Sequence, residues 1–96
     1  MKLNYECLNT ILIYLQNNLI ANDSGQINSI CCDKVAQDLS DKYKYSYGDI
    51  YYSIRKLAEI KYIIADNYYN ENSKIEDITY LGHQYLKGLD QSGYLA

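Results

Sequence analysis

Apolar side chains recur at helical spacing at the start of this chain. Between Asn4 and about Asn18 the intervals between them are three, one, three and four residues, and the residues are Leu8, Ile11, Leu12, Leu15 and Leu19. These intervals place the side chains on one face of a helix. Asn4 is suited to cap the start of this helix, and the run from Asn22 to Gly25 is suited to end it in a loop.

Two further helices follow. After a short extended piece at 26–28, Ser29 is placed to cap a second helix that ends near 41–42 and has one apolar face: Cys32, Val35, Ala36 and Leu39. Ser46 and Asp49 form a capping box ahead of a third helix, with a buried stripe of Ile50, Ile54, Leu57 and Ala58. The opposite face of the third helix carries Gly48, Tyr52, Arg55, Lys56 and Glu59.

The spacing of apolar residues changes after the third helix. Residues 62–64 and 75–78 are rich in strand-forming side chains and flank a polar turn at 67–74, which predicts a hairpin. Thr79 is placed to cap a last helix, ended by the region around Gly88 and Gly93, with an inner side of Leu81, Gly82, Tyr85, Leu86 and Leu89. Residues 89–96 are expected to form a loose C-terminal tail.

The sequence therefore predicts one domain over residues 1–96, mainly α with a small β-hairpin (α+β). The order is helix, short strand, helix, helix, strand, wing, strand, helix. That is the order of a winged helix-turn-helix.

The stretch from Ile78 to Leu86, Ile-Thr-Tyr-Leu-Gly-His-Gln-Tyr-Leu, carries a recognisable pattern. It resembles the hydrophobic-Thr-x-x-Gly-His-x-aromatic-Leu signature of the YjcQ-like and related small phage and prophage winged-helix proteins of unassigned function. The resemblance covers roughly residues 50–89. It implies a winged helix encoded by a phage or another mobile element, and it supplies no activity.

Charge and composition narrow the classes of partner. Nine Lys and Arg against twelve Asp and Glu give a net charge of −3, whereas binding to duplex DNA needs a basic footprint. The chain has thirteen Tyr and no Phe or Trp. These rings either cover a small core or form a hydrated binding interface. Both roles suit tyrosine, because its side chain has an apolar ring and a polar hydroxyl.

The start of the chain bears on location. No apolar run approaches the 18 residues of a membrane span, and Glu6 and Asn9 interrupt the place where a signal peptide needs an apolar run. A cytoplasmic protein is expected, in the host cytoplasm if a phage encodes it.

Few residues are candidates for catalysis or metal binding. Three cysteines without a secretory signal favour reduced thiols that pack as small apolar residues, and a lone histidine makes a zinc site improbable. His83 has no nucleophile or paired carboxylate near it in sequence, so we expect a structural role for Thr79, Gly82 and His83. The imidazole would be half-buried and hydrogen-bonded to backbone, with Gly82 allowing the close approach. No enzyme activity, cofactor or metal is expected.

The candidate binding surface is the outer side of the third helix together with the wing. Its residues are Tyr47, Tyr51, Tyr52, Arg55, Lys56, Tyr68, Tyr69 and Lys74. Because the chain is acidic, the first hypothesis is a non-enzymatic binding protein whose target is a host protein or a protein–nucleic-acid complex. Inhibition of a defence nuclease such as a CRISPR effector is an example.

Two further hypotheses stay open. One is a DNA-binding transcriptional regulator that uses the third helix and the wing, with flanking lysines on phosphates: Lys42, Lys44, Lys61 and Lys74. The other is a homodimer formed through the first or the last helix.

Overall fold

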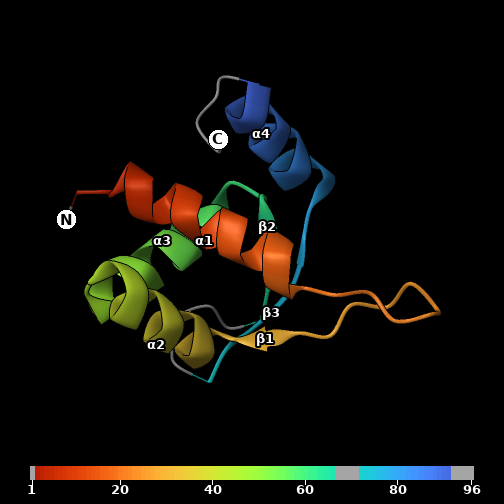
Figure 1. Ribbon diagram of the computed structural model, residues 1–96, viewed down its shortest axis with the longest axis horizontal. Coiled ribbons are helices and arrows are strands. Elements are labelled where there is room, and N and C mark those ends of the chain that lie inside the picture. The colour runs from red at the N-terminus through yellow and green to blue at the C-terminus, as the bar shows by residue number, and fades with distance from the viewer. Residues whose placement is uncertain (1, 67–71, 92–96) are drawn as a thin grey trace.

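The computed structural model describes residues 2–66 and 72–91. That part of the chain forms four helices and a three-stranded antiparallel sheet of order β1-β3-β2 (Figure 1). The elements are α1 (Tyr5–Asn18), β1 (Ile30–Cys31), α2 (Cys32–Tyr43), α3 (Tyr47–Glu59), β2 (Ile63–Ala65), β3 (Lys74–Ile78) and α4 (Tyr80–Gln91). The order of these elements is that of a winged helix-turn-helix, as predicted. The pairing of β1 with β3 was not predicted.

Helix α1 lies at the centre of the molecule, between α4 on one side and the α2–α3 pair on the other (Figure 1). Asn4 caps it as expected, since its Oδ1 accepts the N–H of Cys7 at 3.0 Å. The predicted stripe is buried except at Leu19, which is half-buried and follows the end of the helix. Ile11, Leu12 and Leu15 are fully inaccessible to solvent. Cys7 and Cys32 lie in the same core, where thiols pack as small apolar groups.

The start of α2 differs from the prediction. Ser29 does not cap this helix: Ile30 and Cys31 form β1, and α2 begins at Cys32 without a side-chain cap. The reason is tertiary, because β1 pairs antiparallel with β3, with Ile30 opposite Ile75. A residue committed to a sheet cannot continue a helix, and this pairing is invisible in the local sequence.

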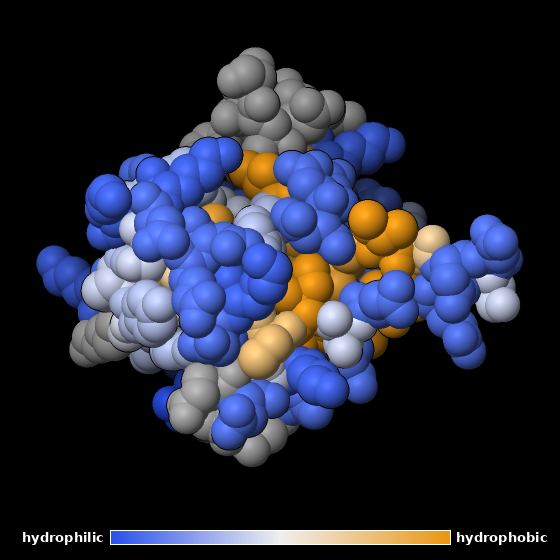
Figure 2. All heavy atoms as spheres, turned by 60° about the horizontal axis from the view of Figure 1, so that its bottom comes forward, coloured by the Kyte–Doolittle hydropathy of each residue, from blue (hydrophilic) through white to orange (hydrophobic). Residues whose placement is uncertain are grey.

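The segment between α1 and β1 projects from the body (Figure 1). Its two arms meet at one bridge, between Ala21 and Ile27, which partly matches the extended piece expected at 26–28. Ile20 in this segment is 66% exposed. The face shown in Figure 2 is largely hydrophilic, with an apolar patch beside the projecting segment.

Helix α4 is longer than predicted. It runs through Gly88 to Gln91, so the expected loose tail does not begin at Leu89, which is half-buried; residues 92–96 lie outside the described part. Leu86 is buried as predicted, but Leu81 is 55% exposed. The hydroxyl of Tyr85 donates to Oδ1 of the buried Asn9 at 2.6 Å, which joins α4 to α1.

Candidate functional site

A tight turn sets the direction of α3. Helix α2 ends where Lys44 takes a left-handed backbone conformation, with φ of 64°, and its N–H bonds to the carbonyl of Ser40. Ser46 then caps α3 by accepting the N–H of Asp49 at 3.1 Å, the half of the predicted capping box that the structure contains. The two helices are therefore joined by only three residues, 44–46, as in a helix-turn-helix.

The inner face of α3 is the predicted one. Ile50, Ile54 and Leu57 are fully buried, and these contacts hold the helix against α1 and α2. Packing of this face leaves the side chains on the other side of α3 directed to solvent.

The outward side of α3 carries two cations that share one carboxylate. Arg55 Nε lies 3.8 Å from Glu59 Oε1, and Lys56 Nζ lies 3.0 Å from Glu59 Oε2. Lys56 also lies 5.1 Å from the centre of the Tyr52 ring. The hydrogen bond to Glu59 raises the pKa of Lys56. Exposed ion pairs of this kind are weak, and a phosphate can displace the carboxylate.

The predicted tyrosines do not form one exposed surface. Tyr47 is 43% exposed and meets the edge of Tyr51, with 6.2 Å between ring centres. Tyr51 is half-buried against the core, with its hydroxyl 3.5 Å from Asp33, and Tyr52 is half-buried as well. Tyr68 and Tyr69 lie outside the described residues.

The described part of the wing ends at Asp66 and resumes at Asn72. The N–H of Lys74 bonds to the side chain of Asp66, and the N–H of Asp66 bonds to the carbonyl of Lys74, so the hairpin is closed at this point. Lys74 is exposed, and Lys61, with φ of 65°, stands exposed at the turn from α3 into β2. Both lysines were predicted to contact phosphates, and this role stays a prediction.

Of the three residues expected to be structural, Thr79 and Gly82 make the expected kind of contact. Thr79 Oγ1 donates to the carbonyl of Lys61 and accepts the N–H of Gly82 at 3.1 Å, so it caps α4 and ties it to the start of the wing. A Cβ at Gly82 would lie 2.3 Å from the carbonyl oxygen of Tyr62. His83, however, is exposed. The half-buried imidazole expected there is wrong, because the close approach to the hairpin is made by Gly82.

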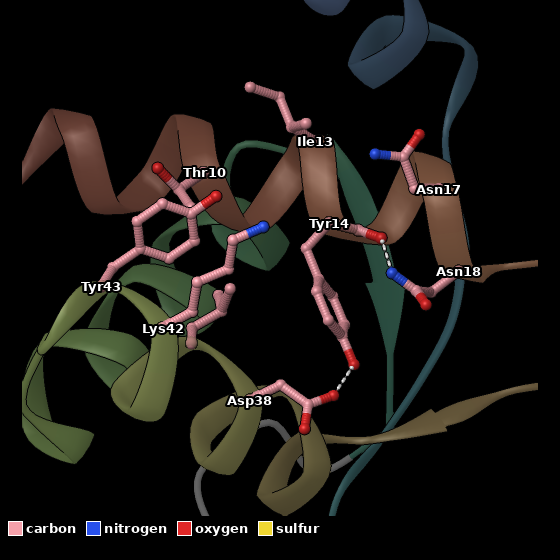
Figure 3. Close-up of a pocket in the computed structure, with 9 residues that line it drawn as sticks. Thr10, Ile13, Tyr14, Asn17, Asn18, Asp38, Lys42 and Tyr43 are labelled. Carbon is pink, nitrogen blue, oxygen red and sulfur yellow. Dashed lines mark hydrogen bonds between the residues drawn. The ribbon is translucent and has the colours of Figure 1, made fainter.

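Residues at the α1–α2 boundary form a cleft that the sequence did not predict. Tyr14 donates its hydroxyl to Asp38 at 2.5 Å across this cleft, and Lys42 and Tyr43 line it as well (Figure 3). Tyr14 lies off the main apolar stripe of α1. This position was the one sequence feature that could have pointed to the cleft. Its polar partner comes from another helix, which sequence spacing does not reveal.

Within residues 2–66 and 72–91, no cluster of three or more His, Cys, Asp or Glu side chains is arranged to hold a metal ion. Over the same residues, none of the helices combines the length and the apolar character that crossing a bilayer requires.

The fold and this surface define the class: a winged helix-turn-helix domain with an accessible third helix. Comparison with solved structures finds a similar one, titled "Protein structure of Type III plasmid segregation TubR". The two share a TM-score of 0.50 and 17% sequence identity over 95% of this chain and 89% of that one, so the likeness is one of fold. No protein-family model matches the chain, and no curated protein matches it significantly. The resemblance to the YjcQ-like proteins stays a prediction.

Proposed function

We propose that this chain is a winged-helix DNA-binding protein that presents α3 and the β2–β3 hairpin to duplex DNA. The docking mode would be that of other helix-turn-helix domains, with α3 in the major groove and the hairpin beside the backbone. The geometry of the α2–turn–α3 unit supports this reading, because it leaves Arg55 and Lys56 on the solvent side of a rigidly packed helix.

The distribution of charge supports the proposal. Residues 42–78, which span the turn, α3 and the hairpin, contain six Lys and Arg against six Asp and Glu, a formal charge of zero. The rest of the chain contains three against six, a formal charge of −3. The acidic excess that gives the net charge of −3 therefore comes from outside this stretch of the sequence. Local potential, and not the whole-chain average, attracts phosphates.

The fold likeness adds support of a coarser kind. The similar structure belongs to a plasmid segregation protein by its title, and a plasmid is a DNA molecule. Likeness to such a protein favours the DNA-binding hypothesis over the hypothesis that this chain inhibits a host protein. At 17% identity the comparison carries no residue roles across.

Binding to a protein partner is the weaker candidate. It rests on exposed rings near α3, and of the predicted set Tyr51 and Tyr52 are half-buried. The comparisons lend it no support. A phage origin, the absence of catalysis and a homodimer stay predictions.

The test is binding to a mixed-sequence duplex at low salt, followed by mobility shift. We expect the wild-type protein to shift the DNA and Arg55→Ala/Lys56→Ala to bind at least about tenfold more weakly, since each phosphate or base contact contributes on the order of 1 kcal/mol. Lys2→Ala/Lys87→Ala is the matched control. It removes the same two charges from exposed positions outside the interface.

Two results would contradict the proposal. One is the absence of any shift at tens of micromolar protein. The other is equal weakening by the two double variants, which would show that only net charge matters.

A further inference from the structure

A cleft of about 230 Å³ opens between α1 and the C-terminal half of α2 (Figure 3). Ile13 and Tyr14 of α1 line it, together with Lys42 and Tyr43 of α2. Its volume equals roughly that of eight water molecules at about 30 Å³ each. It therefore suits a small metabolite and is too small for a drug-sized ligand.

One wall of the cleft is fixed by hydrogen bonds. The Tyr14 hydroxyl donates to Asp38 Oδ2 at 2.5 Å, and Lys34 Nζ lies 3.2 Å from the same oxygen. Asn18 Nδ2 donates to the Tyr14 carbonyl at 2.7 Å. The negative charge of Asp38 is thus already matched by Tyr14 and Lys34, and this wall is preorganised.

The other wall carries the ammonium group of Lys42, which, unlike that of Lys34, has no carboxylate partner among the described residues. Lys42 Nζ lies 5.3 Å from the centre of the Tyr43 ring, and no carboxylate of the described residues lies within 4 Å of it. The side chain of Ile13 and the exposed ring of Tyr43 provide apolar and aromatic surface next to that charge. A cation beside a flat aromatic face suits a planar anion, with its charged end on Lys42 and its ring against Tyr43.

From these contacts we propose that the α1–α2 cleft binds a small aromatic carboxylate. The carboxylate pairs with the Lys42 ammonium, and the ring lies against Tyr43 and Ile13. Asn18 also lines the cleft, and its Nδ2 is committed to the α1 backbone. Its Oδ1 would accept a hydrogen bond from a hydroxyl or amine substituent of the ligand.

The site adjoins the turn that orients α3. Lys42 and Tyr43 are the last residues of α2, directly before the left-handed Lys44. Tyr43 stacks on Tyr45 at 5.8 Å between ring centres, and the Tyr45 hydroxyl donates to Glu6 of α1 at 3.1 Å. A ligand that holds this end of α2 therefore changes DNA affinity, a consequence that rests on the proposed function.

Sodium benzoate is the probe, titrated into ¹⁵N-labelled protein at constant ionic strength maintained with NaCl. We expect saturable amide shifts at Asn18, Lys42 and Tyr43, and at least tenfold weaker binding in Lys42→Gln. Lys44→Gln is the control, since it removes the neighbouring charge at a residue that does not line the cleft. Sodium acetate, which has the charge without the ring, should bind at least tenfold more weakly than benzoate.

Shifts that do not saturate, or equal affinity in wild-type protein and Lys42→Gln, would overturn the proposal. The titration needs no DNA, so its failure is separate from failure of the proposed function. Benzoate binding without any DNA binding would keep the ligand site and reject the DNA-binding role.

Discussion

Among the described glycines, Gly82 is the one with the least room for a side chain. A Cβ there would stand 2.3 Å from the Tyr62 carbonyl oxygen and 2.6 Å from Cγ2 of Ile78, so the backbone of α4 or of the hairpin would have to move. We expect Gly82→Ala to lower the free energy of unfolding by about 1–3 kcal/mol, the range for overpacked cores. Chemical denaturation measures this loss.

Gly88→Ala provides the matched control. Gly88 lies in the same helix, and a methyl group added there would meet nothing within 4 Å, so alanine should stabilise α4 by about 0.5–1 kcal/mol. Equal effects of the two substitutions would contradict the close approach at Gly82.

Tyr14 and Asp38 give stability a dependence on pH. The hydrogen bond from Tyr14 lowers the pKa of the Asp38 carboxyl, while burial, followed by the bond to Asp38, raises the pKa of Tyr14. A lowered carboxyl pKa stabilises the fold above its ordinary value of 3.8 and ceases to do so as pH falls through the folded-state pKa. A raised tyrosine pKa acts in the opposite direction, and its contribution is lost above pH 10.0.

Tyr14→Phe should therefore melt several degrees below wild type at pH 7, and the difference should shrink as pH falls below 3.8. Tyr5→Phe, at a residue that is 68% exposed, is the control and should melt like wild type throughout. A difference for Tyr14→Phe that is unchanged at acid pH would show that the bond to Asp38 contributes nothing.

At the scale of the element, the Glu59 carboxylate should limit the affinity of α3 for DNA. Glu59 holds both Arg55 and Lys56, and it places a negative charge where phosphates would lie. Glu59→Gln should raise DNA affinity roughly fivefold, the equivalent of about 1 kcal/mol for two charges 4 Å apart in water. Fluorescence anisotropy with a labelled duplex measures the change.

Asp23→Asn removes the same charge from an exposed position on the projecting segment and should leave affinity unchanged. If the two variants bind DNA equally well, α3 is not the element that contacts it.

Elements with strong local signals were predictable. The stripes of α1 and α3, and the caps at Asn4, Ser46 and Thr79, follow from residue spacing and were confirmed. The position of the first strand was not. A short strand was expected at 26–28, but β1 lies at Ile30–Cys31, and no local pattern records its pairing with β3.

The rotation of α4 shows the same limit. The pattern placed Leu81 inside, but the contact of Gly82 with the Tyr62 backbone fixes the helix so that Leu81 faces solvent. For the same reason the ring of His83 is exposed and does not support the hairpin as expected. Of the residues expected on the outer side of α3, Arg55 and Glu59 are exposed and Tyr52 is half-buried. The α1–α2 cleft depends on two helices meeting and was not found.

At the scale of the whole molecule, the net charge conceals an uneven distribution along the chain. The acidic excess comes from residues 1–41 and 79–96, while the stretch from 42 to 78 is neutral. A protein of net negative charge should bind DNA only weakly outside a specific site, and with strong dependence on salt.

The most direct test of a DNA interface on α3 is the salt dependence of duplex binding. The logarithm of the association constant should fall linearly with the logarithm of salt concentration, by about 0.9 for each phosphate contacted. In Arg55→Ala/Lys56→Ala we predict a slope that is shallower by about 1–2, and in Lys2→Ala/Lys87→Ala the slope of wild type. No binding at low salt, or the same slope in all three proteins, would contradict this interface.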